Sequence, residues 1–407
     1  MARIVIANVG AHGHVNPTLG VVRALRGAGH EITYCSTEAF RQAVEFAGAR
    51  FVAYESSLGR DRTLGQSMSR RTEFFSLELY REALHVLPQI ENVLRTVEPD
   101  LLIYDRLCVA GRLLADRMNM LAASFYSSYA ANAQFSVRQR YPLQPSSRPE
   151  AELEWQELRR SFCTRHGIEL AEAGSMMLRA APLNIVFLPR AFQIAGHTFD
   201  DRFVFVGPCL SPRTDAGSWS PPNDGARKAA KRLLISLGTL FNHRPEFFRL
   251  CIEAFADSDW EVAMSIGQTV DVNCLGEVLG NILIRRHLPM LDILPHVQVF
   301  IGHAGMNSTM EALYHGVPLI VVPQMPEQRV TAERVVELSL GRKIEMEGLS
   351  AAELRRLVEE TSVDVKVRAS VRAMRQRIEQ SGGAERAARA IDAYLCARAS
   401  KLAVATP

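Results

Sequence analysis

The segment from His303 to Glu311 holds the densest group of side chains in this chain that could bind a ligand. It reads HAGMNSTME, follows the apolar run Val297–Gly302 and leads into a segment compatible with a helix, Met310–Tyr314. A strand, a turn of small residues and the start of a helix point backbone N–H groups and a helix dipole at an anion. We therefore expect a diphosphate at the mouth of this helix and a ribose at the carboxylate of Glu311.

A histidine and an aspartate that follow two early apolar runs could carry out acid–base chemistry. The segment AHGHVNP, with His12 and His14, comes after the run Ile4–Val9, and the run Leu101–Tyr104 ends on Asp105. A histidine titrates near neutral pH, and an aspartate beside it fixes its tautomer. Capping of a helix or a turn by either residue is the alternative interpretation. Because no G-x-S-x-G segment is present, the pair predicts deprotonation of a substrate hydroxyl rather than attack by an enzyme nucleophile.

Two further loops place polar groups at strand ends in the second half of the chain. Gly238 and Thr239 end the segment SLGT, where the glycine lets a ligand approach the backbone and the threonine offers a hydroxyl. Glu327 and Gln328 follow the expected strand Pro318–Val322 and are adjacent hydrogen-bonding groups, as recognition of a polyol requires. Each loop alone is more often a turn or a solvent-exposed pair. Three polar loops at one sheet edge, however, predict a nucleotide-sugar site.

We expect no metal ion in this site. The only D-x-D segment, Asp257–Asp259, falls between an expected helix and an expected strand, so we place it at the opposite edge of the sheet, where it solvates a helix end. The positive charge for a diphosphate would come from the helix dipole and from a protonated or hydrogen-bonding His303.

Apolar runs that alternate with amphipathic segments predict the architecture that positions these residues. Continuous apolar strands separated by helices indicate α/β domains with parallel sheets covered on both faces. A segment rich in Pro, Gly, Ser and Asp, about 211–230, has the composition of a linker and separates two such series. The first series has strands expected at 4–9, 31–36, 51–54, 101–104, 121–125, 183–188 and 203–206, and helices at 17–28, 38–47, 72–97 and 110–117. The second has strands expected at 232–239, 261–265, 281–285, 297–302 and 318–322, a helix at 246–256, and helical structure throughout 351–399.

The composition is that of a globular protein with two domains. At 407 residues the chain exceeds one ordinary core, and a net charge of +3 implies no nucleic-acid partner. Seven scattered cysteines argue against disulfides and zinc and suit a reducing cytosol. No apolar stretch approaches the ~20 residues of a membrane span, and the first apolar run is too short for a signal peptide.

Together, these motifs resemble those of the family 1 glycosyltransferases with the two-domain GT-B fold, most closely the bacterial macrolide-type UDP-glycosyltransferases. The resemblance covers essentially the whole chain and rests on AHGHVNP, LNIVFLPRAFQ, FVGP, SLGT, HAGMNSTMEALYHGVP and VPQMPEQ. It implies two doubly wound, Rossmann-like domains facing each other across a cleft. The first, residues 1–210, would bind the acceptor, and the second, residues 231–383, the nucleotide sugar, with a linker over 211–230. A last helix, about 384–400, would pack back on the first domain.

The resemblance also implies roles for individual residues at the reacting sugar. His14, three residues before Pro17, would be the catalytic base and Asp105 its charge partner, whereas His12 does not match. Glu327 and Gln328 would hold the sugar hydroxyls.

Further residues would contact the rest of the donor. The resemblance places Thr239 near the β-phosphate, His303 at the α-phosphate and Glu311 at the ribose. Other donor contacts would come from the turn residues Gly305, Met306, Asn307 and Ser308 and, from the first domain, from Ser127 and Ser128.

One segment departs from the family pattern. Where the family often has Trp-x-Pro-Gln, with the Trp stacked on uracil, this chain reads His287-Leu288-Pro289-Met290. His287 offers a smaller stacking face and Met290 cannot hydrogen-bond as Gln does, while the backbone of Leu288 can still contact the base edge. The resemblance therefore implies UDP first and TDP second.

These features predict an inverting, metal-independent enzyme that transfers a hexose, in the first place glucose, from a UDP-sugar to a hydroxyl of a hydrophobic natural product such as a macrolide or flavonoid. No cofactor is expected besides the nucleotide sugar. The acceptor pocket would include Phe74, Phe75 and Phe135, although each aromatic also suits a core position. The alternatives are a nucleotide-sugar 2-epimerase, a non-catalytic nucleotide-sugar-binding protein and a glycosyltransferase for a lipid acceptor. We expect a cytoplasmic monomer or weak dimer.

Overall fold

The computed structural model divides into two compact units. Unit 1 comprises Met1–Ser211 with Ser381–Pro407, and unit 2 comprises Pro212–Gln380. Each unit is built on one sheet, and the strand pairs that the structure describes in both sheets are parallel. The expected linker falls almost wholly outside the described residues. These are 1–58, 75–141, 149–166, 179–212, 219, 231–238 and 242–405.

The sheet of unit 1 has the strand order β3-β2-β1-β4-β5-β6-β7. Strands are added first on one side of β1 and then, from β4 onward, on the other side. In such sheets a ligand binds at the carboxyl ends of the two strands where this direction reverses. The strands are β1 Arg3–Ala7, β2 Glu31–Ser36, β3 Arg50–Ala53, β4 Leu101–Asp105, β5 Ala122–Tyr126, β6 Leu183–Val186 and β7 Phe203–Phe205.

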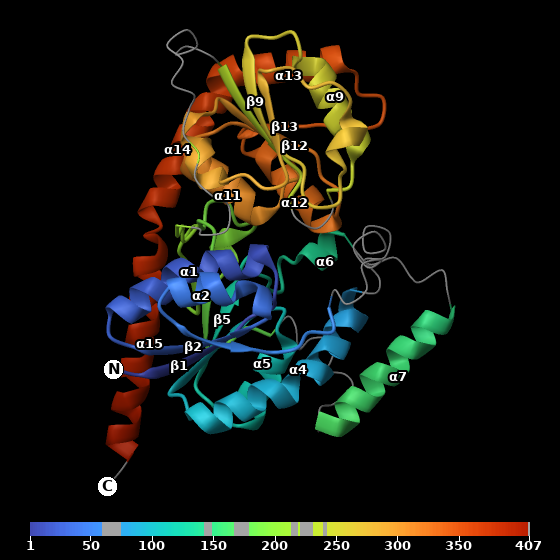
Figure 1. The fold of residues 1–407 in the computed structure, drawn as a ribbon. Helices are drawn as coiled ribbons and strands as arrows, with labels where there is room; N and C mark the ends of the chain where they lie inside the picture. The colour runs from blue at the N-terminus through green and yellow to red at the C-terminus, as the bar shows by residue number, and fades with distance from the viewer. Residues whose placement is uncertain are drawn as a thin grey trace. The chain divides into compact units, whose positions relative to one another are not determined.

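Helices cover both faces of this sheet (Figure 1). They are α1 His12–Gly27, α2 Arg41–Phe46, α4 Phe75–Val97, α5 Val109–Arg117, α6 Val137–Arg140, α7 Pro149–His166 and α15 Gly383–Ala405, with short 3-10 turns η1 Glu38–Phe40 and η3 Gly196–Thr198. Successive side chains of a strand point to opposite faces. Accordingly, Ile4 and Ile6 of β1 enter a core with α1, α2 and α15, whereas Val5 and Ala7 enter a second core with α4 and α5.

The last helix, α15, is part of the core of unit 1. Its Ile391 is fully buried in the same cluster as the apolar face of α1. At its start, the backbone N–H of Gly383 donates to the carbonyl of Val206 at 2.8 Å. Further along, Asp392 lies 2.7 Å from Nε2 of His30. The chain therefore returns to the first unit after completing the second.

The sheet of unit 2 has the order β10-β9-β8-β11-β12-β13 and reverses direction between β8 and β11. Its strands are β8 Lys231–Ser236, β9 Trp260–Ser265, β10 Ile282–Arg285, β11 Val299–Gly302, β12 Leu319–Val321 and β13 Gly341–Lys343. Its helices are α9 Pro245–Phe255, α10 Met290–Ile293, α11 Met306–Tyr314, α12 Pro326–Glu337, α13 Ala351–Val363 and α14 Val365–Gln380, with 3-10 turns η4 Val272–Leu275 and η5 Leu294–His296.

The core of unit 2 forms where α9 and α13 pack on the sheet. Trp260, at the start of β9, is fully buried, and its ring meets that of Phe255 edge to face with 6.3 Å between centroids. Such aromatic pairs add to the free energy gained from burial alone. Buried aliphatic residues of β8 and β11, among them Ile235 and Ile301, complete the cluster.

The two parallel sheets confirm the predicted doubly wound fold class. The differences concern the edge strand β13, which was not expected, and helix boundaries. The helix expected from residue 310 begins at Met306, because Gly305 before it is extended and acts as its N-cap. The helical structure expected throughout 351–399 is present as three consecutive helices, α13, α14 and α15. It breaks at Asp364, whose carboxylate accepts a hydrogen bond from the N–H of Val367 at 3.1 Å and so caps α14. It breaks again at Gly382, which has a φ of +80°.

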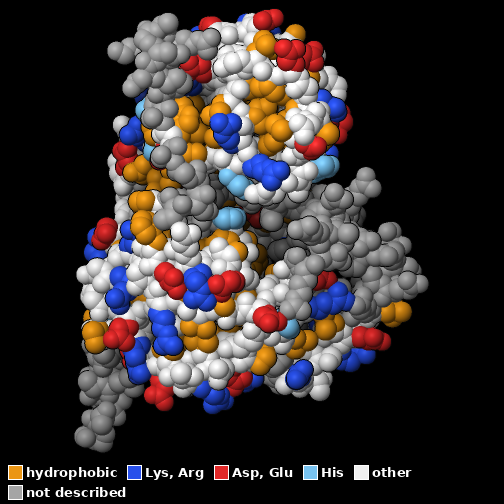
Figure 2. Space-filling model, in the orientation of Figure 1, with side chains coloured by type: hydrophobic (Ala, Val, Ile, Leu, Met, Phe, Trp, Pro, Cys, Tyr) orange, Lys and Arg blue, Asp and Glu red, His pale blue; other side chains and the backbone are white. Residues whose placement is uncertain are grey.

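Acidic and basic side chains are interspersed over the described part of the face shown in Figure 2, as the small net charge suggests. Within the described ranges, no helix combines the length and apolar character that crossing a bilayer requires.

Candidate active site

The carboxyl ends of β1 and β4, where the sheet of unit 1 reverses direction, bring His14 and Asp105 together. His14 lies in the first turn of α1, and its Nδ1 is 2.8 Å from Oδ2 of Asp105, the last residue of β4. The side chain of Asp105 is 1% exposed and that of His14 is 22% exposed. The other carboxylate oxygen accepts the N–H of Leu107 at 2.8 Å. A buried, oriented carboxylate thus holds an imidazole that solvent or substrate can reach.

A third side chain approaches the same imidazole nitrogen. Ser127 directly follows β5, and its Oγ lies 3.0 Å from Nδ1 of His14. Ser128 is the next residue and is half-buried. Ser127 is therefore a neighbour of the histidine within unit 1, while a role of either serine toward the donor stays a prediction.

A buried polar network that sequence reasoning missed fixes the backbone beneath His14. Nδ2 of Asn8 donates to the His14 carbonyl at 3.1 Å and lies 2.7 Å from Oη of Tyr34. The Tyr34 hydroxyl lies 2.7 Å from Oγ1 of Thr18, which donates to the Val15 carbonyl at 2.8 Å. The Thr18 hydroxyl donates its only proton to the Val15 carbonyl. The Tyr34 hydroxyl therefore donates to Oγ1 of Thr18 and accepts the hydrogen bond from Nδ2 of Asn8. Burial raises the pKa of Tyr34 well above its ordinary value, so its phenol stays protonated for this role.

In unit 2, the loops after β8 and β11 enclose the imidazole of His303. Gly238 has a φ of +82°, and a Cβ added there would lie 2.5 Å from Cε1 of His303. A Cβ added at Gly305 would lie 2.4 Å from Nε2 of the same ring. Both positions therefore need glycine to admit the histidine. Thr239, which follows Gly238 and is expected near the β-phosphate, lies outside the described residues.

His303 is neutral near pH 7. Burial lowers its pKa to about 4, although a hydrogen bond to the backbone of Ser236 acts in the opposite direction. Of the two forms that the sequence left open, the protonated one is therefore wrong as a source of positive charge. A neutral imidazole still donates one hydrogen bond to an oxygen, and the amino end of α11 supplies the positive dipole.

The first turn of α11 presents backbone amides rather than side chains. Gly305 is its N-cap and no side chain caps the helix, so its first N–H groups have no partner within the helix. Met306 is only 4% exposed as a whole residue, so its side chain is not open to a ligand. Ser308 turns its hydroxyl back to the Gly305 carbonyl at 3.1 Å. Ala304 holds a φ of +62°, a strained conformation for a residue with a Cβ. Strain of this kind is found at ligand sites.

Glu311 lies one turn further along α11, and its carboxylate is buried. Its side chain is 1% exposed, and Oε1 accepts a hydrogen bond from Nδ2 of Asn307 at 2.8 Å. Asn307 therefore orients this carboxylate. Binding of a ribose by Glu311 stays a prediction.

The adjacent residues Glu327 and Gln328 face different surroundings at the start of α12. Glu327 is exposed, whereas Gln328 is 8% exposed. Oε1 of Gln328 accepts the backbone N–H of Gln324 at 2.8 Å and so shapes the loop that leads into the helix. The amide nitrogen of Gln328 is the donor that could meet a sugar hydroxyl.

Asn242 is a second residue that sequence reasoning missed. Its side chain is 1% exposed, its Nδ2 donates to the Gly238 carbonyl, and its Oδ1 accepts from Oγ1 of Thr269, both at 2.8 Å. It thus ties the loop after β8 to the loop after β9. Gly267 makes room for it, because a Cβ there would lie 1.9 Å from Nδ2.

The segment at the expected base-binding position lies between β10 and α10. His287 is exposed, and its Nε2 lies 2.9 Å from Nε2 of Gln268. Leu288 is only 7% exposed, and contact of its backbone with a base edge stays a prediction.

Of the three expected acceptor residues, Phe135 is the one whose side chain the structure describes. Phe74 lies outside the described residues, and Phe75 begins α4. Phe135 is 6% exposed, with its ring packed edge to face on Tyr129 at 5.6 Å between centroids. Phe135 is therefore buried against Tyr129, and its role in an acceptor pocket stays a prediction.

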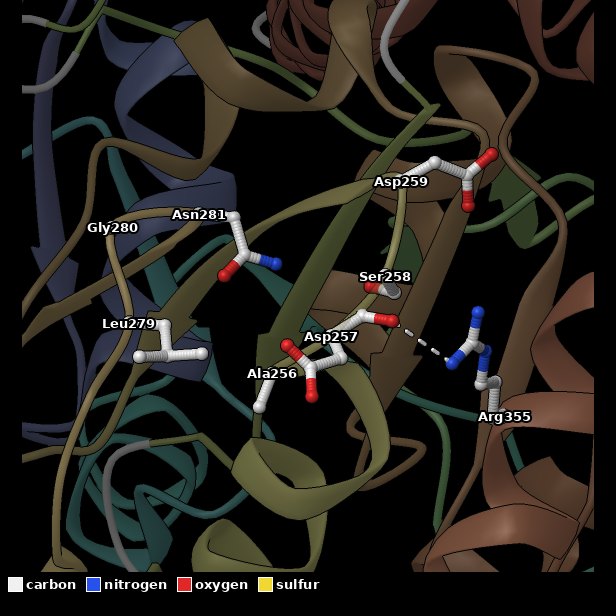
Figure 3. Close-up of a pocket in the computed structure, with 8 residues that line it drawn as sticks. All are labelled: Ala256, Asp257, Ser258, Asp259, Leu279, Gly280, Asn281 and Arg355. Atoms are coloured by element: carbon white, nitrogen blue, oxygen red, sulfur yellow. Dashed lines mark hydrogen bonds between the residues drawn. The ribbon is translucent and has the colours of Figure 1, made fainter.

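The D-x-D segment Asp257–Asp259 lies just before β9, at the amino edge of the sheet, as expected. It lines an open pocket together with Asn281 and Arg355, which donates to the Asp257 carbonyl at 3.2 Å (Figure 3). Asp259 lies 3.3 Å from Nζ of Lys231 at the start of β8. His303 and Gly238 follow the carboxyl ends of strands, so these carboxylates are at the opposite edge. Among the described residues, no cluster of His, Cys, Asp and Glu has the geometry of a metal site.

Known proteins resemble this chain over nearly its whole length. The model of the C-terminal domain of erythromycin biosynthesis protein CIII-like proteins matches residues 249–388. NDP-glycosyltransferase YjiC of Bacillus subtilis (strain 168) is 40% identical over 96% of this chain and 97% of its own length. Oleandomycin glycosyltransferase of Streptomyces antibioticus is 32% identical over 98% of this chain and 92% of its own. The crystal structure of CalG4, the calicheamicin glycosyltransferase, is 35% identical and superposes with a TM-score of 0.81 over 97% of this chain and 98% of its own.

Two doubly wound domains and this agreement over both of them make the protein a glycosyltransferase with the GT-B fold. The chain belongs to the bacterial family 1 glycosyltransferases, as its motifs predicted.

Proposed function

We propose that this enzyme is an inverting transferase that moves a hexose from a UDP-sugar to a hydroxyl group of a hydrophobic natural product. Glucose is the first candidate for the hexose. The observation that carries the proposal is the 2.8 Å contact between Nδ1 of His14 and Oδ2 of Asp105. A carboxylate that accepts the Nδ1 proton leaves the lone pair on Nε2, which is the tautomer that a general base needs.

In the proposed reaction, Nε2 of His14 removes the proton of the acceptor hydroxyl. The acceptor oxygen then attacks the anomeric carbon while the bond from that carbon to the diphosphate breaks. UDP leaves from the opposite face of the sugar, so an α-linked donor gives a β-glycoside. His14 ends as an imidazolium, which the buried Asp105 stabilises until the proton is released.

The loops of unit 2 would stabilise the leaving diphosphate. The uncapped amides at the start of α11 and the N–H of a neutral His303 are donors fixed before the reaction begins. Donors of this kind stabilise charge that develops in the transition state. We propose that Glu311 holds the ribose and that Glu327 and Gln328 hold the sugar hydroxyls.

We propose that the reaction needs neither a metal ion nor a cofactor. The D-x-D carboxylates lie at the amino edge of the sheet of unit 2, whereas the expected diphosphate loop follows a strand's carboxyl end. The free thiols of all seven cysteines suit a cytoplasmic setting.

We favour UDP and take TDP as second, because His287 offers only a small face for stacking. Relatives named for oleandomycin and calicheamicin support an acceptor among antibiotics and similar natural products.

A screen of donors against acceptors, read by mass spectrometry, tests the function. The purified enzyme would be incubated with UDP-glucose or TDP-glucose and with phenolic or macrolide acceptors, with and without excess chelator. We expect a hexose adduct with UDP-glucose, unchanged by the chelator, and a β-anomer by NMR. The absence of any adduct, or conversion of the donor sugar without an acceptor, would contradict the proposal. The second result would identify an epimerase.

A further inference from the structure

Arg106 is a cationic residue beside the His14–Asp105 pair that the proposed mechanism does not use. It directly follows Asp105 at the carboxyl end of β4, and its backbone N–H donates to the Phe125 carbonyl at 3.0 Å. Because successive side chains of a strand alternate, Asp105 faces His14 of α1, whereas Arg106 lies on the other face over the ring of Tyr126. Its guanidinium carbon is 5.3 Å from the centroid of that ring.

The guanidinium of Arg106 has no counter-charge among the described residues. No acidic side chain of the described ranges forms an ion pair with it, and its Nε is buried without a hydrogen-bond partner. Both oxygens of the adjacent Asp105 are occupied, one by Nδ1 of His14 and one by the N–H of Leu107. Arg106 as a whole is partly exposed, so an anionic ligand would approach the terminal nitrogens of the guanidinium rather than its buried Nε.

The neighbours of Arg106 do not neutralise its charge. Burial raises the pKa of Tyr126, although Arg106 acts in the opposite direction, so the phenol stays neutral. Arg138 of α6, whose charge interacts with that of Arg106, has the same sign. Burial lowers the pKa of Arg138, and the charge of Arg106 lowers this pKa further. Arg106 itself directly follows β4 at the carboxyl edge of the sheet, where ligands bind in folds of this kind.

We propose that Arg106 binds an anionic group of the acceptor, in the first place a carboxylate, next to the catalytic pair. The inference rests on the proposed function, because it describes part of the acceptor site. A guanidinium matches a carboxylate with two parallel N–H···O hydrogen bonds, and such charge-assisted bonds are the strong ones. The acceptor class that fits is an aromatic or polyketide compound carrying both a hydroxyl and a carboxylate.

Calorimetric titration of the full chain with 4-hydroxycinnamate and with its methyl ester tests this site without requiring turnover. The acid and the ester share the hydroxyl and the ring and differ in the charge that Arg106 would bind. We expect the wild type to bind the acid more tightly than the ester. Arg106→Gln should weaken acid binding by about ten- to one-hundred-fold and leave ester binding within about twofold.

Two further variants make the measurement specific. Arg106→Lys keeps the charge but loses the paired geometry, so it should bind the acid with intermediate affinity, and it carries the test if the Gln variant fails to fold. Arg95→Gln, on α4, removes an exposed arginine that pairs with Glu91 and should bind both compounds as the wild type does.

The result that would overturn the inference is acid binding that does not depend on residue 106, or an equal loss for acid and ester. Transfer of glucose to the ester, measured in parallel, separates this outcome from the proposed function. If the ester is glycosylated while acid binding ignores residue 106, the anion site fails and the function stands. If acid binding depends on Arg106 but neither compound is glycosylated, the anion site stands and the proposed function fails.

Discussion

At the scale of single residues, the base has to be both held and reachable. Asp105 is almost fully buried and His14 is partly exposed, which meets both requirements. His14→Ala should lower kcat by about three orders of magnitude, because general base catalysis contributes ~10²–10⁴. UDP binding, measured by calorimetry, should stay near the wild-type value, since the expected diphosphate loop lies in unit 2.

His12 provides the matched control for this substitution. It lies on the same turn, and its ring packs edge to face on Phe40 at 5.0 Å between centroids rather than on Asp105. His12→Ala should retain most of the transfer activity. Wild-type transfer by His14→Ala, or an equal loss in both variants, would refute the assignment of the base.

The lowered pKa of His303 predicts how the free energy of unfolding depends on pH. Its pKa is lowered by burial to about 4 in the folded chain, against 6.5 for an ordinary histidine. Between these values the unfolded chain binds a proton at this residue and the folded chain does not, so the free energy of unfolding falls as the pH falls. The loss approaches about 3 kcal/mol over the window, at ~1.4 kcal/mol per pH unit. Denaturant unfolding near pH 7 and near pH 5 should show a smaller decrease for His303→Gln than for the wild type. Identical decreases would contradict a His303 that stays neutral in the folded chain.

The residues that sequence reasoning found and those it missed differ in a physical way. His14 and Asp105 stood out because a polar residue after an apolar run marks a strand end. Asn242 was missed because its side chain hydrogen-bonds to two loops that are distant in the sequence, and no local pattern reveals such contacts. The turn 303–305 is a mixed case. The small residues predicted a turn here, but not that the positive φ would fall on Ala304 or that Gly305 is needed because His303 lies against it.

At the scale of elements, the first turn of α1 depends on a network that enters from β2. Tyr34→Phe removes the hydroxyl that accepts from Asn8 and donates to Thr18. The loss of two buried hydrogen bonds should lower the free energy of unfolding by about 1–3 kcal/mol. Because Asn8 also holds the His14 carbonyl, kcat should fall about three- to tenfold while the KM for the donor stays unchanged. Steady-state kinetics and denaturant unfolding measure the two effects.

Tyr104→Phe is the matched control for that element. Tyr104 is also a buried tyrosine of unit 1, but its hydroxyl accepts from Arg112 of α5, away from the network. This variant should lose stability and keep its kcat. If both variants lowered kcat equally, the network would have no special role in positioning the base.

The types of most elements followed from periodicity, but their ends did not. Apolar runs predicted the strands because parallel strands are buried on both faces. Helix ends depend on single contacts, such as the Asp364 carboxylate that starts α14, and a pattern of apolar spacing does not reveal those. Tyr34 and Thr18 were equally hidden, since a buried hydroxyl in an apolar run looks the same whether or not it has a partner.

At the scale of the whole molecule, the chain passes from unit 2 back to unit 1 near residue 381. The helices α13 to α15 lie consecutively in the sequence, and their composition does not separate them. The helices differ in the hydrophobic core against which each apolar face packs. Val358 of α13 joins the core of unit 2, and Ile391 of α15 joins the core of unit 1. Only the family resemblance, and not the pattern of residues, led us to expect the return of the last helix.

Ile391→Ala tests whether α15 supports the unit that holds the catalytic base. Ile391 is fully buried in the cluster that contains Val22 and Leu25 of α1, so its truncation should cost about 2–5 kcal/mol. The loss should appear in unit 1, as faster amide hydrogen exchange in β1 and α1, while β8 and β11 exchange as in the wild type. Arg389→Ala removes an exposed side chain from the same helix and should leave exchange unchanged in both units. Faster exchange confined to unit 2 would show that α15 does not belong to the cooperative unit of His14, whereas faster exchange in both would show that the two units unfold together.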